Sequence, residues 1–196
     1  MSNFGQFSGD PITQWLHIDP DEHRKMRLVE PFWYDDPHGV RWLAPVSSEI
    51  DGASIPRPLW TLVGSPFTGN YRRASIVHDV ACVDKARPDR DVHRMFYFAC
   101  RADGVDEPTA QIMYAAIRMF GPRWLTRAQI EEQWAGSMPP FGAAAMVPPP
   151  SAEEQARLEQ AFASFMEEVQ AGKTATSFDE LEAQMDAQLA PGGTDA

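Results

Sequence analysis

The dipeptide His78-Asp79 is the feature of the sequence with the clearest chemical potential, because it interrupts an apolar run from Ile76 to Ala81. A buried carboxylate is costly unless it is paired or bound to a cation. An imidazole titrates near neutral pH and can take a proton from water. The pair is therefore a candidate functional site, in which the carboxylate is paired or bound to a cation. The alternative interpretation is an ordinary His-Asp pair on a surface or at a helix cap.

A second histidine and a cysteine fall within reach of this pair. His93 follows His78 across the short segment Asp84–Asp89, and both flanking segments have a helical pattern. Helices joined by so short a loop pack antiparallel, which brings His93 near His78 and near Cys82, one turn after His78. Cys100 lies about two turns farther from the loop, so we expect no disulfide with Cys82.

The elements that must position these residues predict an α+β fold that is mainly helical, with an N-terminal β-hairpin packed on an antiparallel helical core and a C-terminal helical tail. The turn sequence Asp35–Gly39 predicts the hairpin, and Ser47–Pro58 reads as a structured loop. Thr109 is the expected N-cap of the third helix. The predicted strands are Trp15–Asp19, Lys25–Tyr34 and Val40–Pro45, and the predicted helices of the body are Tyr71–Val83, Arg90–Arg101, Thr109–Phe120 and Thr126–Trp134.

Composition and charge divide the chain into a globular body (1–137), a proline-rich linker (138–150) and an acidic tail (151–196). The formal net charge is -11, of which -8 falls on the tail and -3 on the first 150 residues. Nucleic-acid binding requires clustered Lys and Arg, so no nucleic-acid partner is expected.

The tail has the pattern of two amphipathic helices. Ser151 with Glu154, and Ser177 with Glu180, have the spacing of capping boxes. Apolar residues recur behind each cap at helical spacing, and such stripes must cover the body, each other or a partner. A protein partner that binds residues 151–196 is therefore one interpretation.

The sequence has no feature of export or membrane insertion. Its first residues, MSNFGQFSGD, lack the basic start and apolar run of a signal peptide. No stretch approaches the roughly 20 apolar residues of a transmembrane helix. Two cysteines do not make a disulfide framework. We expect a cytoplasmic or virion-associated protein.

Four motifs occur in a characteristic order: DGASIPRPLW (51–60), YRRASIVHDVAC (71–82), VHRMFYFACRADGV (92–105) and MYAAIRMFG (113–121). Together they resemble DUF1353, a domain-of-unknown-function family of phages, prophages and bacterial genomes. The resemblance covers roughly residues 25–122 and leaves the tail outside. It implies an architecture and the position of a site, because the family carries no assigned reaction.

The layout of the family pattern, Asp-x-Ala-Ser-Ile-Pro followed by His-Asp, is similar to that of the secreted calcium-dependent phospholipases. That likeness implies His78 as the general base on water and Asp79 as a calcium ligand. It also implies further oxygen ligands from Asp51 and the carbonyl groups of Gly52–Ile55, with Ser54 supporting this loop.

Two positions depart from the resemblance. His93 stands where an orienting Asp is implied, and Cys82 stands where a Tyr is implied. A neutral imidazole cannot stabilise a protonated His78 as a carboxylate would. The site is then inactive or altered, or it binds a softer metal such as zinc through His78, Cys82, His93 and an aspartate, Asp79 or Asp51. We rank zinc below calcium, and a Cys82–His nucleophile below both, because it needs an exposed thiolate.

Our leading hypothesis is a metal-dependent hydrolase-like protein that acts on a lipid or cell-envelope ester for a phage or a bacterial delivery system. The alternative is a non-catalytic phage or phage-like assembly protein that uses its C-terminal helices to dock a partner. The retained His78-Asp79 pair and DGASIP loop favour the first hypothesis, and the changes at Cys82 and His93 favour the second.

Overall fold

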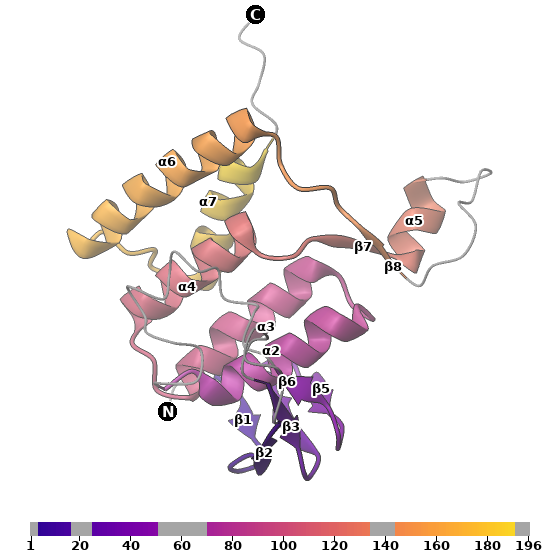
Figure 1. The fold of residues 1–196 in the computed structure, drawn as a ribbon. Helices are drawn as coiled ribbons and strands as arrows, with labels where there is room; N and C mark the ends of the chain where they lie inside the picture. Colours follow the sequence, from indigo (N-terminus) through magenta and orange to yellow (C-terminus); the bar gives the residue numbers. More distant parts are fainter. Residues whose placement is uncertain (1–3, 17–24, 51–69, 134–143, 191–196) are drawn as a thin grey trace, which may run out of the picture.

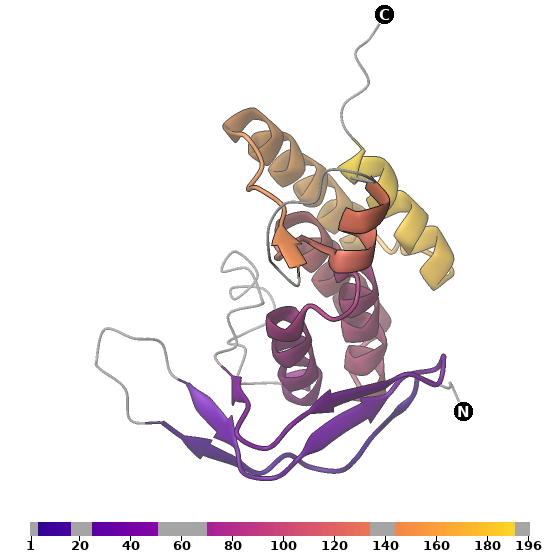
Figure 2. The same cartoon turned by 90° about the vertical axis from the view of Figure 1, so that its right-hand side faces the viewer.

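The computed structural model describes residues 4–16, 25–50, 70–133 and 144–190. These residues contain six helices, two three-stranded antiparallel sheets and a two-stranded sheet, so the predicted α+β class is confirmed. The six strands of the two larger sheets lie at one end of the molecule and the helices stack above them (Figures 1 and 2). The strands are β1 (Gln6–Phe7), β2 (Thr13–Trp15), β3 (Met26–Leu28), β4 (Phe32–Asp35), β5 (Arg41–Ala44), β6 (Glu49–Ile50), β7 (Trp124–Thr126) and β8 (Ala144–Met146). The helices are α2 (Arg72–Asp84), α3 (Asp89–Ala102), α4 (Glu107–Phe120), α5 (Arg127–Gln133), α6 (Ala152–Gln170) and α7 (Phe178–Leu189).

The predicted hairpin forms between β4 and β5, which pair antiparallel. Its turn is held by the Asp36 carboxylate, which accepts hydrogen bonds from the backbone N–H groups of His38 (2.8 Å) and Val40 (2.9 Å). The prediction of one strand over Lys25–Tyr34 is wrong, because β3 and β4 belong to different sheets. Pro31 lies between them, and its missing N–H favours a break there.

Two strands that the sequence did not predict complete the sheets. In the order β1-β4-β5, Gln6 of β1 lies opposite Asp35. In the order β2-β3-β6, Met26 of β3 lies opposite Ile50, although Ile50 belongs to the predicted loop. The strand expected at Trp15–Asp19 shares only Trp15 with β2, which ends there, and residues 17–19 of that segment lie outside the described residues.

Helices α2 and α3 confirm the predicted pair to within about a residue at each end. The third helix begins earlier than predicted: its N-cap is Asp106 and not Thr109, whose backbone N–H and hydroxyl both donate to the Asp106 carboxylate (2.9 and 2.8 Å). Pro108 is accommodated in the first turn, where its missing N–H costs nothing. None of the helices in the described ranges is long and apolar enough to cross a bilayer.

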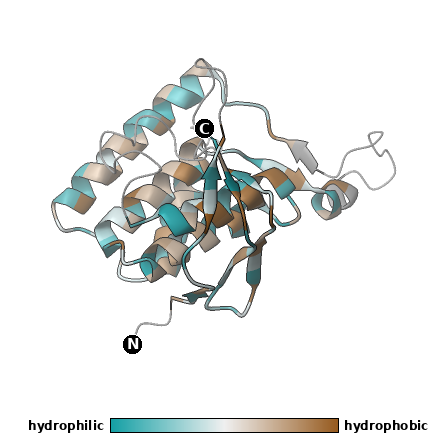
Figure 3. Ribbon diagram, turned by 60° about the horizontal axis from the view of Figure 1, so that its bottom comes forward, coloured by the Kyte–Doolittle hydropathy of each residue, from teal (hydrophilic) through white to brown (hydrophobic). Residues whose placement is uncertain are grey.

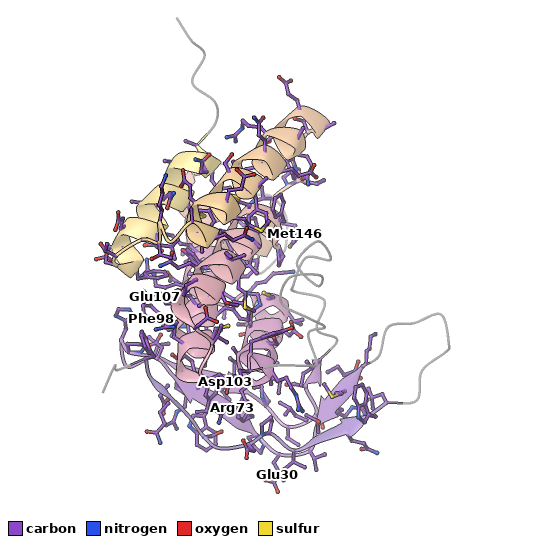
Figure 4. All side chains as sticks on the ribbon, turned by 90° about the vertical axis from the view of Figure 1, so that its left-hand side faces the viewer. Glu30, Arg73, Phe98, Asp103, Glu107 and Met146 are labelled. Atoms are coloured by element: carbon purple, nitrogen blue, oxygen red, sulfur yellow. The ribbon has the colours of Figure 1, made fainter. Side chains whose placement is uncertain are left out.

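An ion pair joins the start of α2 to the end of α3. Arg73 donates to the Asp103 carboxylate from Nε (2.7 Å) and lies 2.6 Å from it through Nη2. The two side chains lie close together near the β layer (Figure 4). The Asp103 side chain is only 9% exposed, so this pair helps to fix how α2 and α3 lie against each other.

A small projection of β7, α5 and β8 follows α4 (Figure 1). β8 lies inside the segment predicted as a linker, and it pairs antiparallel with β7, with Met146 opposite Trp124. Trp124 is 1% exposed and its indole N–H donates to the carbonyl oxygen of Arg87 (2.8 Å), which ties the base of the projection to the loop between α2 and α3.

The tail forms α6 and α7, and both predicted caps are confirmed. The hydroxyls of Ser151 and Ser177 accept from the backbone N–H groups of Glu154 and Glu180, each at 3.2 Å. Hydrophobic and hydrophilic residues alternate along α6 (Figure 3), and both helices pack on α4. The apolar stripes of the tail therefore cover the body. Their buried residues are Leu158, Phe162, Phe165, Val169, Leu181 and Met185.

Candidate functional site

His78 of α2 and His93 of α3 meet in the core between the two helices. Both residues are 0% exposed, and His78 Nε2 lies 3.0 Å from His93 Nδ1. The ring of Phe96 packs against His78 with the centroids 4.7 Å apart. The two ring centroids of the histidines are 5.3 Å apart, close to the nitrogen separation plus the distance from each ring's centre to its nitrogen. The two nitrogens therefore point at each other, as in a hydrogen bond.

The partner on the far side of His93 determines where the protons lie. His93 Nε2 is 3.1 Å from the carbonyl oxygen of Pro122, which can only accept. His93 Nε2 therefore carries the proton, and His93 Nδ1 accepts one from His78 Nε2. This assignment leaves the lone pair of a neutral His78 on Nδ1.

Cys82 lies next to His78, one turn later on α2. Its Sγ is 3.8 Å from Nδ1 and 3.7 Å from Nε2 of His78. Because the two distances are nearly equal, the sulfur lies off the lone-pair axis of either nitrogen. This placement gives no support to a Cys82–His78 nucleophile. Cys82 and Cys100 are both buried thiols.

The surroundings of the two imidazoles disfavour their protonation. Burial, and then the neighbouring His93, hold the pKa of His78 well below its ordinary value. Burial and the nearby Arg118 guanidinium lower the pKa of His93 to about 3, and the bond to Pro122 only partly opposes them. Both rings are therefore neutral at neutral pH.

Asp79 lies in the wall of a pocket with a volume of about 990 Å³, between α2 and strands β5 and β6. Cys82 and Pro122, which contact His78 and His93, line the same pocket. Asp79 is 4% exposed. His78 and His93 are 0% exposed and are separated from this pocket by the residues that they contact, Cys82 and Pro122.

Only some of the predicted metal ligands lie within the described residues. Asp51 and Ser54 lie outside the described residues, so their predicted meeting with Asp79 stays a prediction. Within the described ranges no three His, Cys, Asp or Glu side chains are grouped to hold a metal ion. His78 Nε2 and His93 Nδ1 point at each other, so these two nitrogens could not bind zinc together unless the rings turned. Asp79, a carboxylate in a pocket wall, fits a hard cation better.

The sequence did not identify the Pro122 carbonyl as a member of the site. A backbone carbonyl carries no side-chain signal, and the dipeptide Gly121-Pro122 indicated only the end of a helix. Trp124, whose ring centroid lies 6.1 Å from that of His93, was likewise not assigned to this region. Both residues come from the segment that follows α4, so this segment completes the surroundings of a pair carried by α2 and α3.

Comparison with known proteins agrees with the resemblance seen in the motifs. Residues 26–117 match the family model described as "Protein of unknown function (DUF1353)". The uncharacterized protein y4jT of Sinorhizobium fredii is 40% identical over 139 residues, which are 71% of this chain and 41% of that protein. The uncharacterized protein y4iH of the same organism is 38% identical over 109 residues, which are 56% of this chain and 45% of that protein. The chain thus spans less than half the length of these curated relatives. No solved structure matches it.

Proposed function

We propose that this chain is a small hydrolase-like protein of a phage or a bacterial delivery system, in which His78 acts as a general base toward a lipid or cell-envelope ester. The supporting observation is the hydrogen-bonded series from His78 through His93 to the Pro122 carbonyl. It fixes the tautomer of His78 and leaves Nδ1 as its proton acceptor.

In this proposal His93 and the Pro122 carbonyl together replace an orienting carboxylate. When His78 takes a proton from water at Nδ1, its Nε2–H continues to donate to His93, whose own proton stays on Nε2 toward the carbonyl. The positive charge on His78 is then stabilised by two dipoles. This stabilisation is weaker than that from a carboxylate anion. We therefore expect slow hydrolysis.

The pocket brings the reactants to this base. His78 is 0% exposed, so the proposal requires a movement that admits water to Nδ1, and Cys82, which lines the pocket beside His78, is the residue that we expect to move. Asp79, and by prediction Asp51, would hold calcium, which polarises an ester carbonyl when bound.

Ester hydrolysis by the purified full chain tests the proposal. Suitable substrates are p-nitrophenyl esters of increasing acyl length and phospholipid vesicles, each with calcium, with zinc and with a chelator. We expect His78→Gln to lose roughly 100-fold or more of the rate. The control His38→Gln changes an exposed turn histidine and should keep the rate. Equal rates in folded wild type and His78→Gln would remove His78 from the reaction.

A non-catalytic assembly protein is the second candidate. The observation in its favour is that both imidazoles are 0% exposed and have a lowered pKa, as expected for core residues. Docking through the tail gains less support, because the apolar stripes of α6 and α7 already cover α4. If His78→Gln preserves particle assembly or delivery in the native host while no esterase activity is measurable, this second candidate is favoured.

A further inference from the structure

Helix α7 presents one continuous face to the body. Its residues 178, 181, 182, 185 and 186 follow the spacing of a single helical face. Leu181 and Met185 are both 0% exposed. The ring of Phe178 lies among Tyr97, Phe98 and Tyr114, with centroid distances of 4.8, 4.9 and 5.1 Å. The apolar residues of this face therefore pack on the body along the length of α7.

The acidic half of this face meets three arginines of the body. Glu182 accepts from Arg94 through Nε (3.2 Å) and Nη2 (2.8 and 2.9 Å). Arg90 Nη2 lies 3.0 Å from Glu182 and 2.7 Å from Asp186. Arg118 donates to Asp186 at 2.7 Å. Each carboxylate is thus shared by two guanidinium groups.

Because these groups are buried, the contact selects for a charged carboxylate at position 182. The Glu182 side chain is 10% exposed and that of Arg118 is 8% exposed. Burial works to raise the pKa of Glu182, and the bonds from Arg90 and Arg94 outweigh it, so the net pKa shift is downward. A neutral side chain at position 182 would leave the Arg94 guanidinium without its carboxylate and Arg90 with Asp186 alone, which is costly.

The residues of the body that bind α7 lie on α3 and α4. In the described part of the chain, the ion-pair partners of Arg90, Arg94 and Arg118 are all on α7. The segment before α7 is held as well, because the Gln111 amide donates to the Ala175 carbonyl (2.9 Å) and accepts from the Ala175 N–H (3.1 Å). The face combines cations, aromatic rings and a backbone clamp.

We infer that the face of α3 and α4 is a binding site for an acidic amphipathic helix, which α7 occupies within the same chain. The fitting partner has an aromatic residue, then leucine and an acid, then methionine and an acid, spaced as residues 178, 181, 182, 185 and 186. The tail reaches the body through residues 147–150, which have no regular structure, so it is a tethered ligand that a helix of the same pattern can replace.

The experiment makes the tail exchangeable in the full-length protein. A protease site is inserted between Pro148 and Pro149, which are exposed, and the chain is cut after folding. A fluorescent peptide of residues 149–190 is then added, and its uptake is followed by anisotropy. We expect uptake that weakens with salt. The Glu182→Gln peptide should bind roughly 10- to 100-fold more weakly.

A matched peptide serves as control. Glu167→Gln changes an exposed acid of α6 and should bind like the parent peptide. Equal affinity of the Glu182→Gln and parent peptides overturns the inference. So does failure of the parent peptide to exchange, or loss of helical circular dichroism from the body when the tail is displaced, because α7 would then be a core element and not a ligand. Hydrolysis is not measured, so these outcomes are independent of the proposed enzymatic role.

Discussion

Mild acid should destabilise the protein through the buried histidine pair. Both His78 and His93 have a lowered pKa in the folded state, because burial disfavours the charged ring. In the unfolded chain each ring titrates near its ordinary value of about 6.5. Below that value the unfolded state binds protons that the folded state refuses. The stability that comes from keeping the rings neutral is complete above about pH 6.5 and is lost as the pH falls toward the folded pKa, which for His93 is about 3.

The size of the effect follows from the number of protons. One unit below the unfolded pKa, each histidine that stays neutral in the folded state costs about 1.4 kcal/mol, so the pair costs about 2.8 kcal/mol near pH 5.5. Total stabilities of about 5–15 kcal/mol make that a large share. Arg118 also faces His93 and opposes uptake of a proton there. A proton shared between the two rings would reduce the loss toward that of one histidine.

Urea unfolding between pH 7.5 and about 5.5 measures this loss, in a range where most carboxylates stay ionised. His93→Gln removes one titrating ring and should reduce the pH-dependent loss to about 1.4 kcal/mol, whatever its effect on absolute stability. The exposed His38→Gln should leave the loss unchanged. A wild-type free energy of unfolding that is flat over this range, or imidazole NMR signals that show both rings protonated in the folded state near pH 6, would refute the reasoning.

Three further predictions concern stability and are measured by chemical denaturation. Leu158→Ala removes a side chain that is 0% exposed in the contact between tail and body, and should cost about 2–5 kcal/mol. Asp106→Ala removes the cap of α4 that accepts two bonds from Thr109, and should cost about 1 kcal/mol; an unchanged midpoint would contradict the cap. Asp103→Asn keeps the shape of the side chain but removes the charge paired with Arg73, whose side chain is 31% exposed. We expect the free energy of unfolding to fall by about 1–2 kcal/mol at low salt. An unchanged free energy of unfolding would mean that solvent already screens the pair.

The sequence predicted those features that depend on neighbouring residues. The caps at Ser151 and Ser177 were predictable because each joins a hydroxyl to an N–H group three residues later. The approach of His93 to His78 followed from helical spacing and a short loop, which together leave few arrangements. In both cases the interacting groups are fixed by local geometry before any packing is known.

Features that depend on distant backbone atoms were not predictable in this way. β1 and β6 are two residues long, too short to show alternation, and each is defined by pairing with a distant strand. The Pro122 carbonyl reaches His93 across 29 positions and leaves no trace in a side-chain pattern. The apolar stripes of the tail were visible, but a stripe does not identify its partner, and only the packing on α4 does.

Helix α4 contacts the tail and is followed directly by the residue that bonds the histidine pair. Arg118, in its last turn, pairs with Asp186 of the tail, and Pro122, directly after the helix, accepts from His93. The tail contact through Arg118 and the carbonyl that orients the histidine pair thus lie at the same end of α4. The family match ends at residue 117, so it contains both histidines but neither Arg118 nor Pro122. The motif residues alone are thus an incomplete description of the site, because the tautomer of His78 depends on backbone that the motifs do not include.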